Sequence, residues 1–479
     1  MTTRRFLLGG LAAIAAVPGC AGAPATAPRP SVRLTGSGSA SALVARSGVT
    51  GNVGYVVADA SGRVLDHHAG DTALPPASTA KAITALYALD RLGPGYRYGT
   101  SVIAGGPVSG GIVQGDLWLV GGGDPTLDTD ALDAMAAELA SRGVRGVTGQ
   151  FRAYGGALPL IDQIDPGQPV HANYNSAISG LNLNFNRAYF SWGPGGAGAS
   201  MDARSGRVVP PVTTSRIRVA GRSSPTYTYS SGQGVDNWTV ASAALGRGGN
   251  RWLPVRNPDN YTADVFRWLA ARHGVALPAP VVTRSAPAGA VLVQHASAPL
   301  TEILSDMLEF SNNMTAETVG LTASRQGSLS ASGAAMTQWA AAKYGVQMDL
   351  RDHSGLSGRS RVAPSQMVRA LVLAQSDPNG RYLRSLMKDE GLFDASGREH
   401  LSDTIRIKAK TGTLSFASGL AGYVSAGGAE RVFATFCADM DRRAQLDPGS
   451  EARPAGGAAW TRNARILQSR LIESWVAQA

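Results

Sequence analysis

Two residue types are scarce in this chain of 479 residues, and the first of them is cysteine. The only cysteines are Cys20 and Cys437, so the chain cannot build a disulfide-rich scaffold. Because Cys437 lies within an apolar run, we expect it to be a buried core residue. Charged residues make up only 16% of the chain and hydrophobic residues 44%, which indicates a globular protein rather than a disordered one.

Lysine is the second scarce type, with five lysines among the 44 basic residues. Arginine keeps its proton in proteins, whereas lysine can lose one where its surroundings lower its pKa. Two of the lysines occur in chemically suggestive contexts, Ser78-Thr79-Ala80-Lys81 and Lys410-Thr411-Gly412-Thr413. A chain that prefers arginine, yet places lysine three residues after a serine, is a candidate for using an amine as a base.

Several patterns of other function classes are absent. The seven histidines include no His-Glu-x-x-His arrangement, so we predict no metal site, and we expect no cofactor. A Gly-x-Ser-x-Gly motif is also missing. Basic and aromatic residues do not alternate, so nucleic acid is not expected as the main ligand despite a net charge of +10. That charge suits anionic polymers or membrane surfaces, and a genome composition that favours arginine codons explains the arginine bias equally well.

The first thirty residues indicate targeting rather than fold. Arg4-Arg5 precedes an apolar run over residues 6–17, which is too short to span a bilayer. We predict an export signal over residues 1–20 and a Pro- and Ala-rich tether over residues 21–30, with a periplasmic or cell-envelope location. The sequence before Cys20 resembles a lipoprotein processing site, which would anchor the protein to the membrane through a lipid. Cleavage at the small residues 21–23 is the alternative.

The remaining sequence predicts an α/β (α+β) fold in which both ends of the chain form one domain, an antiparallel sheet flanked by helices, over residues 31–96 and 286–479. Strand, hairpin and helix patterns occupy residues 52–58, 63–67, 79–92, 404–414, 420–424, 431–437 and 460–475. Residues 97–285 are rich in Gly, Thr, Val and Asn and predict a large strand-rich insertion, with a second unit nested within about residues 170–255. A helical stretch over residues 300–325 returns the chain to the first domain.

Three short motifs could carry chemistry. Ser78 and Lys81 have the i, i+3 spacing that places side chains on one helix face, and a neutral lysine could activate the serine as a nucleophile. Ser311-Asn312-Asn313 could offer a proton relay and a group that binds a carbonyl. On a strand, Lys410 and Gly412 share one face, and the missing side chain of Gly412 would let a ligand approach the backbone. The backbone N–H groups of Ser78 and Thr413 could then form an oxyanion hole. Taken singly, each of the first two motifs is also typical of a helix cap.

Together and in this order, the three motifs resemble those of the serine penicillin-recognising enzymes. Within that group the chain is similar to the D-alanyl-D-alanine carboxypeptidase/endopeptidase family of class C low-molecular-mass penicillin-binding proteins, which have a transpeptidase-like domain with a large insertion. Residues 115–127 resemble the signature of that insertion, and residues 352–357 resemble a loop near the active site of the family. His353 replaces the usual glycine of the loop, and residues 193–251 match the family only loosely.

The resemblance implies a serine DD-peptidase that acts on D-Ala-D-Ala peptide stems of peptidoglycan and is acylated by β-lactams. It implies roles for eight residues: Ser78 as nucleophile, Lys81 as its base, Ser311 as proton relay, Asn313 as substrate amide ligand, and Lys410, Thr411, Gly412 and Thr413 in binding the terminal carboxylate. A β-lactamase-like hydrolase is one alternative, although no glutamate between residues 314 and 410 is followed four residues later by asparagine. A non-catalytic wall-binding scaffold is the other.

Overall fold

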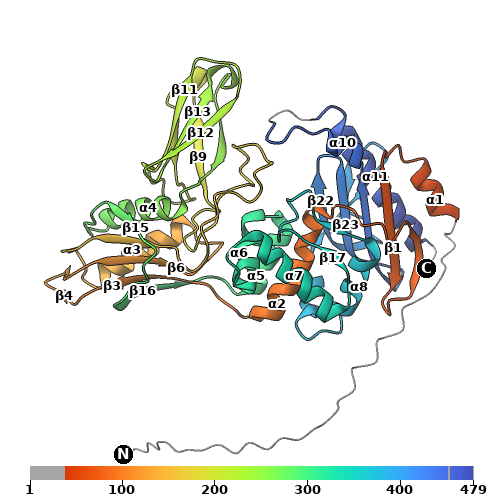
Figure 1. The fold of residues 1–479 in the computed structure, drawn as a ribbon, viewed down its shortest axis with the longest axis horizontal. Coiled ribbons are helices and arrows are strands. Elements are labelled where there is room, and N and C mark those ends of the chain that lie inside the picture. Colours follow the sequence, from red (N-terminus) through yellow and green to blue (C-terminus); the bar gives the residue numbers. More distant parts are fainter. Residues whose placement is uncertain (1–37, 451–453, 478–479) are drawn as a thin grey trace, which may run out of the picture. The chain divides into compact units, whose positions relative to one another are not determined.

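The computed structural model describes residues 38–450 and 454–477, so the predicted export signal, the tether and Cys20 lie outside the described residues. The largest sheet has six antiparallel strands in the order β19-β22-β23-β24-β1-β2. Figure 1 labels β22 and β23, from the C-terminal part of the chain, and β1, from the N-terminal part, in this sheet. The sheet joins both ends of the chain, as the sequence predicts. Its strands are β1 (Asn52–Asp59), β2 (Val64–His68), β19 (Lys388–Asp389), β22 (Arg406–Leu414), β23 (Ala417–Ala426) and β24 (Ala429–Ala438).

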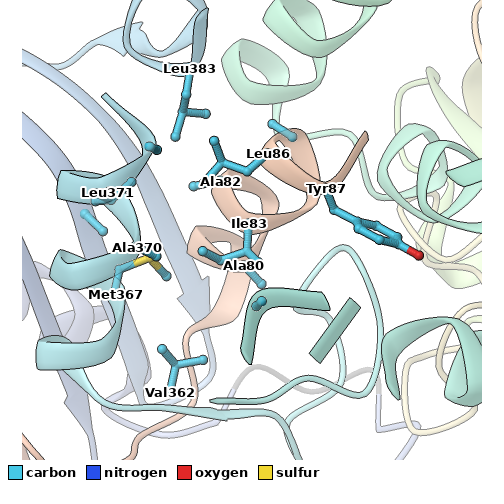
Figure 2. Close-up of a cluster of buried hydrophobic side chains, with 14 of the residues drawn as sticks. Ala80, Ala82, Ile83, Leu86, Tyr87, Val362, Met367, Ala370, Leu371 and Leu383 are labelled. Carbon is cyan, nitrogen blue, oxygen red and sulfur yellow. The ribbon is translucent and has the colours of Figure 1, made fainter. Parts of the chain in front are cut away.

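Helices cover both faces of this sheet, and the side chains of β1 alternate between the two faces. Val56 belongs to the apolar cluster around α2 (Ala80–Leu92) and α8 (Pro364–Ala374), whereas Val57 belongs to the cluster around α11 (Gly457–Val476). A strand covered on both faces needs apolar residues at successive positions, and six consecutive residues of β1 are buried. Figure 2 shows the apolar side chains of α2 packed against those of α8. This packing fixes the start of α2, where Ser78 and Lys81 lie.

The local predictions at both ends of the chain are largely confirmed. β1 pairs with β2, and β23 pairs with β24 across a Gly427-Gly428 turn in which both residues have positive φ angles. The predicted face of α11 is buried, and so is Cys437. The single helical stretch predicted over residues 300–325 is wrong. It is broken into α5 (Leu300–Phe310) and α6 (Asn313–Ser324), because Ser311 adopts a left-handed conformation with φ 56°.

The segment between α2 and α5 builds a separate apolar core from four further sheets and two helices. Its five-stranded sheet runs β15-β8-β6-β3-β16, and β16 pairs with β3 although it lies beyond residue 285. The domain boundaries therefore stay a prediction. The elements of this segment are β3 (Gly99–Ala104), β4 (Val108–Ser109), β5 (Ile112–Val113), β6 (Leu117–Gly121), α3 (Thr129–Ser141), β7 (Gly146–Val147), β8 (Phe151–Tyr154), β9 (Arg187–Trp192), β10 (Ser200–Asp202), β11 (Ser215–Ala220), β12 (Tyr227–Gly232), β13 (Val235–Ala241), β14 (Gly249–Pro254), α4 (Pro258–Arg272), β15 (Pro280–Val282) and β16 (Ala290–Ala296).

The remaining α-helices and strands of the described chain are α1 (Gly38–Ala45), α7 (Leu329–Tyr344), β17 (Met348–Asp349), β18 (Arg361–Val362), α9 (Leu383–Leu386), β20 (Leu392–Phe393), β21 (Glu399–His400) and α10 (Met440–Ala444). Within the described ranges, no helix combines the length and the apolar character needed to cross a membrane.

Candidate active site

Ser78 lies in a single 3₁₀ turn, η1 (Ala77–Thr79), that leads directly into α2. Ala77 has φ 48°, a left-handed conformation that is uncommon for a residue with a side chain and occurs mostly where surrounding structure enforces it. Two glycines, Gly355 and Gly412, let neighbouring segments pack closely against Ala77 and Ser78. A Cβ atom on Gly355 would lie against the carbonyl oxygen of Ala77, and one on Gly412 would lie 2.9 Å from the backbone nitrogen of Ser78. Gly412 thus makes room for η1 as well as leaving the strand open beside it.

Lys81 sits one helical turn after Ser78 and is completely buried, whereas Ser78 is only half-buried. Its Nζ atom lies 2.9 Å from Ser78 Oγ, 2.8 Å from Asn313 Oδ1 and 2.8 Å from the carbonyl oxygen of Ser354. The other half of the Asn313 amide is also fixed, since its Nδ2 donates to the carbonyl oxygen of Tyr174 at 3.1 Å. Three distant stretches of chain therefore meet at one amine.

The partners of Lys81 decide where its lone pair points when the amine is neutral. A neutral amine has two N–H donors and one acceptor lone pair. The carbonyl oxygens of Asn313 and Ser354 can only accept, so they take both N–H groups. Ser78 is the one neighbour of the three with a proton to donate. The neutral form of Lys81 must therefore direct its lone pair at the Ser78 hydroxyl, which is the geometry of a base beside a nucleophile.

The surroundings of Lys81 favour that neutral form. Burial, and then the nearby charge of Lys410, lower the pKa of the Lys81 amine from its ordinary value to about 7. The charges of Glu317 and Asp352 act in the opposite direction. Lys81 has no carboxylate within ion-pairing distance in the described ranges, and neither has Lys410, whereas the other three lysines pair with carboxylates: Lys343, Lys388 and Lys408.

Ser311 and Asn313 flank the break between α5 and α6. Asn312 caps α6 by accepting a hydrogen bond from the backbone of Thr315 at 3.0 Å, which places Asn313 in the first turn with its side chain on Lys81. Ser311 ends α5 and is half-buried, and its hydroxyl has no hydrogen-bond partner among the described residues. It is a free donor and acceptor two residues from the amide that holds Lys81.

Strand β22 presents its buried residues Lys410 and Gly412 together, as the period of a strand requires. Burial lowers the pKa of the Lys410 amine to about 8. Thr411 is half-buried and Thr413 is exposed, and neither side chain hydrogen-bonds to the Ser78–Lys81–Asn313 cluster in the described chain. Arg465 of α11 reaches Thr413 Oγ1 at 3.5 Å, and this extra cation was missed by the sequence reasoning, which treated α11 as a packing helix only.

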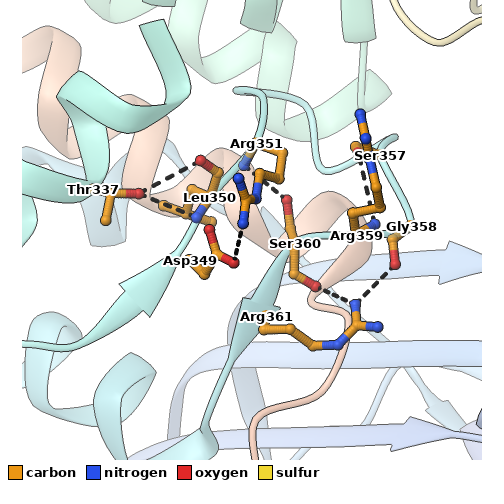
Figure 3. A network of polar contacts seen from close by, with 9 residues as sticks. All are labelled: Thr337, Asp349, Leu350, Arg351, Ser357, Gly358, Arg359, Ser360 and Arg361. Atoms are coloured by element: carbon orange, nitrogen blue, oxygen red, sulfur yellow. Dashed lines mark hydrogen bonds and ion pairs between the residues drawn. The ribbon is translucent and has the colours of Figure 1, made fainter. Parts of the chain in front are cut away.

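The loop over residues 352–357 supplies the carbonyl that binds Lys81. Asp352 accepts hydrogen bonds from the backbone of Gly355 and Ser357 and so closes the loop on itself. Figure 3 shows how the flanking residues are fastened: Thr337 of α7 bonds to both backbone groups of Leu350, and Arg361 bonds to the carbonyl oxygens of Gly358 and Ser360. The loop is therefore a fixed wall of the site.

His353 serves packing in this loop rather than proton transfer. Burial lowers the pKa of its imidazole to about 3, and the ring contacts Ser332 and Met336. A Cβ atom on Gly320 would lie 2.1 Å from the ring, so α6 needs glycine at this position because His353 is present. The glycine is thus paired with the histidine that departs from the family pattern.

A double-mutant cycle tests that pairing. We expect Gly320→Ala to lower the free energy of unfolding by roughly 2–3 kcal/mol through overpacking. In a His353→Ala background the added methyl group would enter the space left by the ring, so the same change should cost less than about 1 kcal/mol. Urea unfolding of the four proteins measures both values. Equal costs in the two backgrounds would contradict the pairing.

The fold is that of a penicillin-binding protein: the crystal structure of penicillin binding protein 4 from Haemophilus influenzae matches with a TM-score of 0.71 at 20% identity, over 90% of this chain and 99% of that one. The D-alanyl-D-alanine carboxypeptidase of Actinomadura sp. is 32% identical over 404 residues, which are 78% of this chain and 74% of the relative. D-alanyl-D-alanine carboxypeptidase DacB of Haemophilus influenzae is 24% identical over 418 residues, 80% and 84% of the two chains.

The D-Ala-D-Ala carboxypeptidase 3 (S13) family matches residues 41–453, and this chain belongs to that family. The family, the fold class and the enzyme class predicted from the sequence are thereby confirmed. In the described part of the chain, no group of three or more His, Cys, Asp or Glu residues is arranged to hold a metal ion.

Proposed function

We propose that the protein is a serine DD-peptidase that cleaves D-Ala-D-Ala peptide stems of peptidoglycan through an acyl-enzyme on Ser78. The observation that carries the proposal is the contact of 2.9 Å between Lys81 Nζ and Ser78 Oγ, in a setting where both other partners of Lys81 are acceptors. Because those acceptors occupy its N–H groups, Lys81 can take the proton of Ser78 as the hydroxyl attacks.

The reaction then proceeds in two steps, acylation of Ser78 and hydrolysis of the acyl-enzyme. Ser78 Oγ attacks the carbonyl carbon of the penultimate residue, the proton passes to Lys81, and the backbone N–H groups of Ser78 and Thr413 stabilise the oxyanion. Ser311 gives its proton to the departing amine and takes one from protonated Lys81, so D-alanine leaves as the C–N bond breaks and both side chains return to their starting protonation states. Water then attacks the ester, returns a proton to Ser78 and releases the shortened peptide. A cross-linked peptide as leaving amine makes the same chemistry an endopeptidase reaction.

Substrate binding uses the remaining residues. Asn313 holds the substrate amide through the second N–H of its Nδ2, the one that does not bond to Tyr174. Lys410, Thr411 and Thr413 bind the terminal carboxylate beside Gly412, and Arg465 adds positive charge there. Two further proposals concern location: export to the periplasm or cell envelope, and attachment to the membrane through a lipid on Cys20.

Incubation with a fluorescent penicillin tests the proposed function against its alternatives. We expect a covalent adduct that persists through denaturing electrophoresis, together with release of D-alanine from a D-Ala-D-Ala peptide. Fast loss of the label with accumulation of hydrolysed penicillin would instead indicate a β-lactamase. A protein that neither labels nor releases D-alanine would be a scaffold, and the proposal would fail.

A further inference from the structure

Two buried carboxyl groups lie next to the proposed nucleophile and base without any part in the reaction as described. Glu317 is completely buried in α6, four residues after Asn313, and Asp352 is nearly so in the loop. Burial raises the pKa of both carboxyl groups, and the charge of Asp352 adds to the rise for Glu317. A buried carboxylate is costly unless hydrogen bonds compensate it, so its presence in this position calls for a role.

The hydrogen bonds of Glu317 all lead to the loop that contacts Lys81. Its carboxylate accepts the backbone N–H of Ser354 at 2.7 Å and the backbone N–H of His353 at 3.0 Å. The carbonyl oxygen of the same Ser354 accepts from Lys81 Nζ at 2.8 Å. Ser354 is therefore held on both sides: its N–H group bonds to Glu317 and its carbonyl oxygen bonds to Lys81. These bonds to Glu317, with one from the Ser354 side chain, favour its charged form.

Helix α6 carries both Glu317 and Asn313, the residue that contacts Lys81 directly. Asn313 and Glu317 are one turn apart on α6, so they face the same side of the helix. Asn313 contacts Lys81 directly, and Glu317 contacts it through the backbone of Ser354. A single rigid helix thereby fixes both acceptors of the Lys81 amine.

We infer that Glu317 is a positioning residue for acylation, which accepts the backbone N–H groups of His353 and Ser354 and so holds the Ser354 carbonyl on Lys81. The inference rests on the proposed function and extends it. Around Lys81, the other charged groups are Lys410 of β22 and Asp352 of the loop, with Asp165 acting on Asp352, while His353 is neutral. Since the charge of Glu317 raises the pKa of Lys81, its loss should lower that pKa.

The rate of β-lactam acylation as a function of pH tests this inference, with Glu317→Gln as the main variant. Glutamine keeps the size and removes the charge, so we expect the acid limb to move to lower pH by about 1 unit. We also expect the plateau rate to fall at least ~10-fold, because an amide oxygen accepts the two N–H groups less strongly. A purely structural role would lower the plateau without moving the limb.

Two further variants make the result decisive. Glu317→Asp keeps the charge but withdraws it by one methylene, so the plateau should fall while the limb stays. Glu302→Gln makes the same chemical change on the exposed face of α5 and should alter neither. An acid limb of Glu317→Gln that coincides with the wild-type limb would overturn the inference. If Glu317→Gln fails to fold, a plateau rate of Glu317→Asp equal to that of wild type would overturn the inference.

Failure of the inference remains distinguishable from failure of the proposed function. Wild-type protein that forms no adduct with any β-lactam contradicts the acyl-enzyme itself. Wild-type protein that acylates normally, with variants of Glu317 that match it in plateau and limb, contradicts only the role of Glu317.

Discussion

Replacing Ser78 by alanine is expected to abolish the covalent β-lactam adduct and to lower D-alanine release by at least ~10⁴-fold. The substitution removes the hydroxyl that contacts Lys81 and leaves the Asn313 and Ser354 oxygens in place. Because alanine is compatible with the helical turn of η1, we expect the fold to persist. Intact-mass spectrometry after incubation with a β-lactam, together with a D-alanine assay, measures both effects.

An exposed serine provides the matched control. Ser396 lies in a surface turn, so Ser396→Ala should acquire one adduct per chain and keep wild-type turnover. An adduct of equal yield on Ser78→Ala would assign the nucleophile to another residue. A melting temperature near that of wild type would show that loss of the adduct reflects chemistry and not unfolding.

The second large effect concerns the base, where Lys81→Met should slow acylation by about 10²–10⁴-fold. Methionine fills a similar volume but cannot accept a proton. Lys81→Arg is the informative partner variant, because a guanidinium keeps the positive charge and cannot lose its proton at neutral pH. Both variants should therefore be slow. An active Lys81→Arg protein would contradict the role of Lys81 as a base. The measurement is the second-order rate of acylation by a β-lactam.

The pH dependence of the wild-type protein follows from the same residue. Only the neutral amine accepts a proton, and the pKa of Lys81 is lowered to about 7. The acylation rate should thus be high above pH 7 and should be lost as the pH falls through that value. An unperturbed lysine would give the opposite expectation at neutral pH, since it would be protonated until the pH rose above about 10.

The three motifs and the outline of the fold could be predicted because their signals are local. Ser78 and Lys81 are one turn apart, and the alternation along β22 places Lys410 and Gly412 on one face without any knowledge of the fold. The break at Ser311 could not be read from periodicity, since the apolar pattern continues across it and only a backbone φ of 56° reveals it. The tripeptide therefore looked like part of a helix.

Other features depend on long-range contacts and left weaker traces in the sequence. The spacing of Glu317 four residues after Asn313 was a usable signal, since it places both on one helix face. The carbonyl groups of Ser354 and Tyr174 left none, because every residue has a backbone carbonyl. The need for glycine at position 320 could not be predicted either, since it arises from the His353 ring on a different segment.

The pairing of β1 with β24 limits how far the chain can fold while it is being synthesised. β1 occupies an inner position between β2 and β24, and Asn52 lies opposite Ala438 at one end of the pairing. β1 is synthesised early and can pair with β24 only after almost the whole chain has been made. The separation of hundreds of residues between the two strands makes closure of the sheet slow. A nascent chain stopped before residue 429 would carry Ser78 and Lys81 and still leave an open edge along β1. Premature termination should consequently yield an aggregation-prone fragment in place of a partly active peptidase.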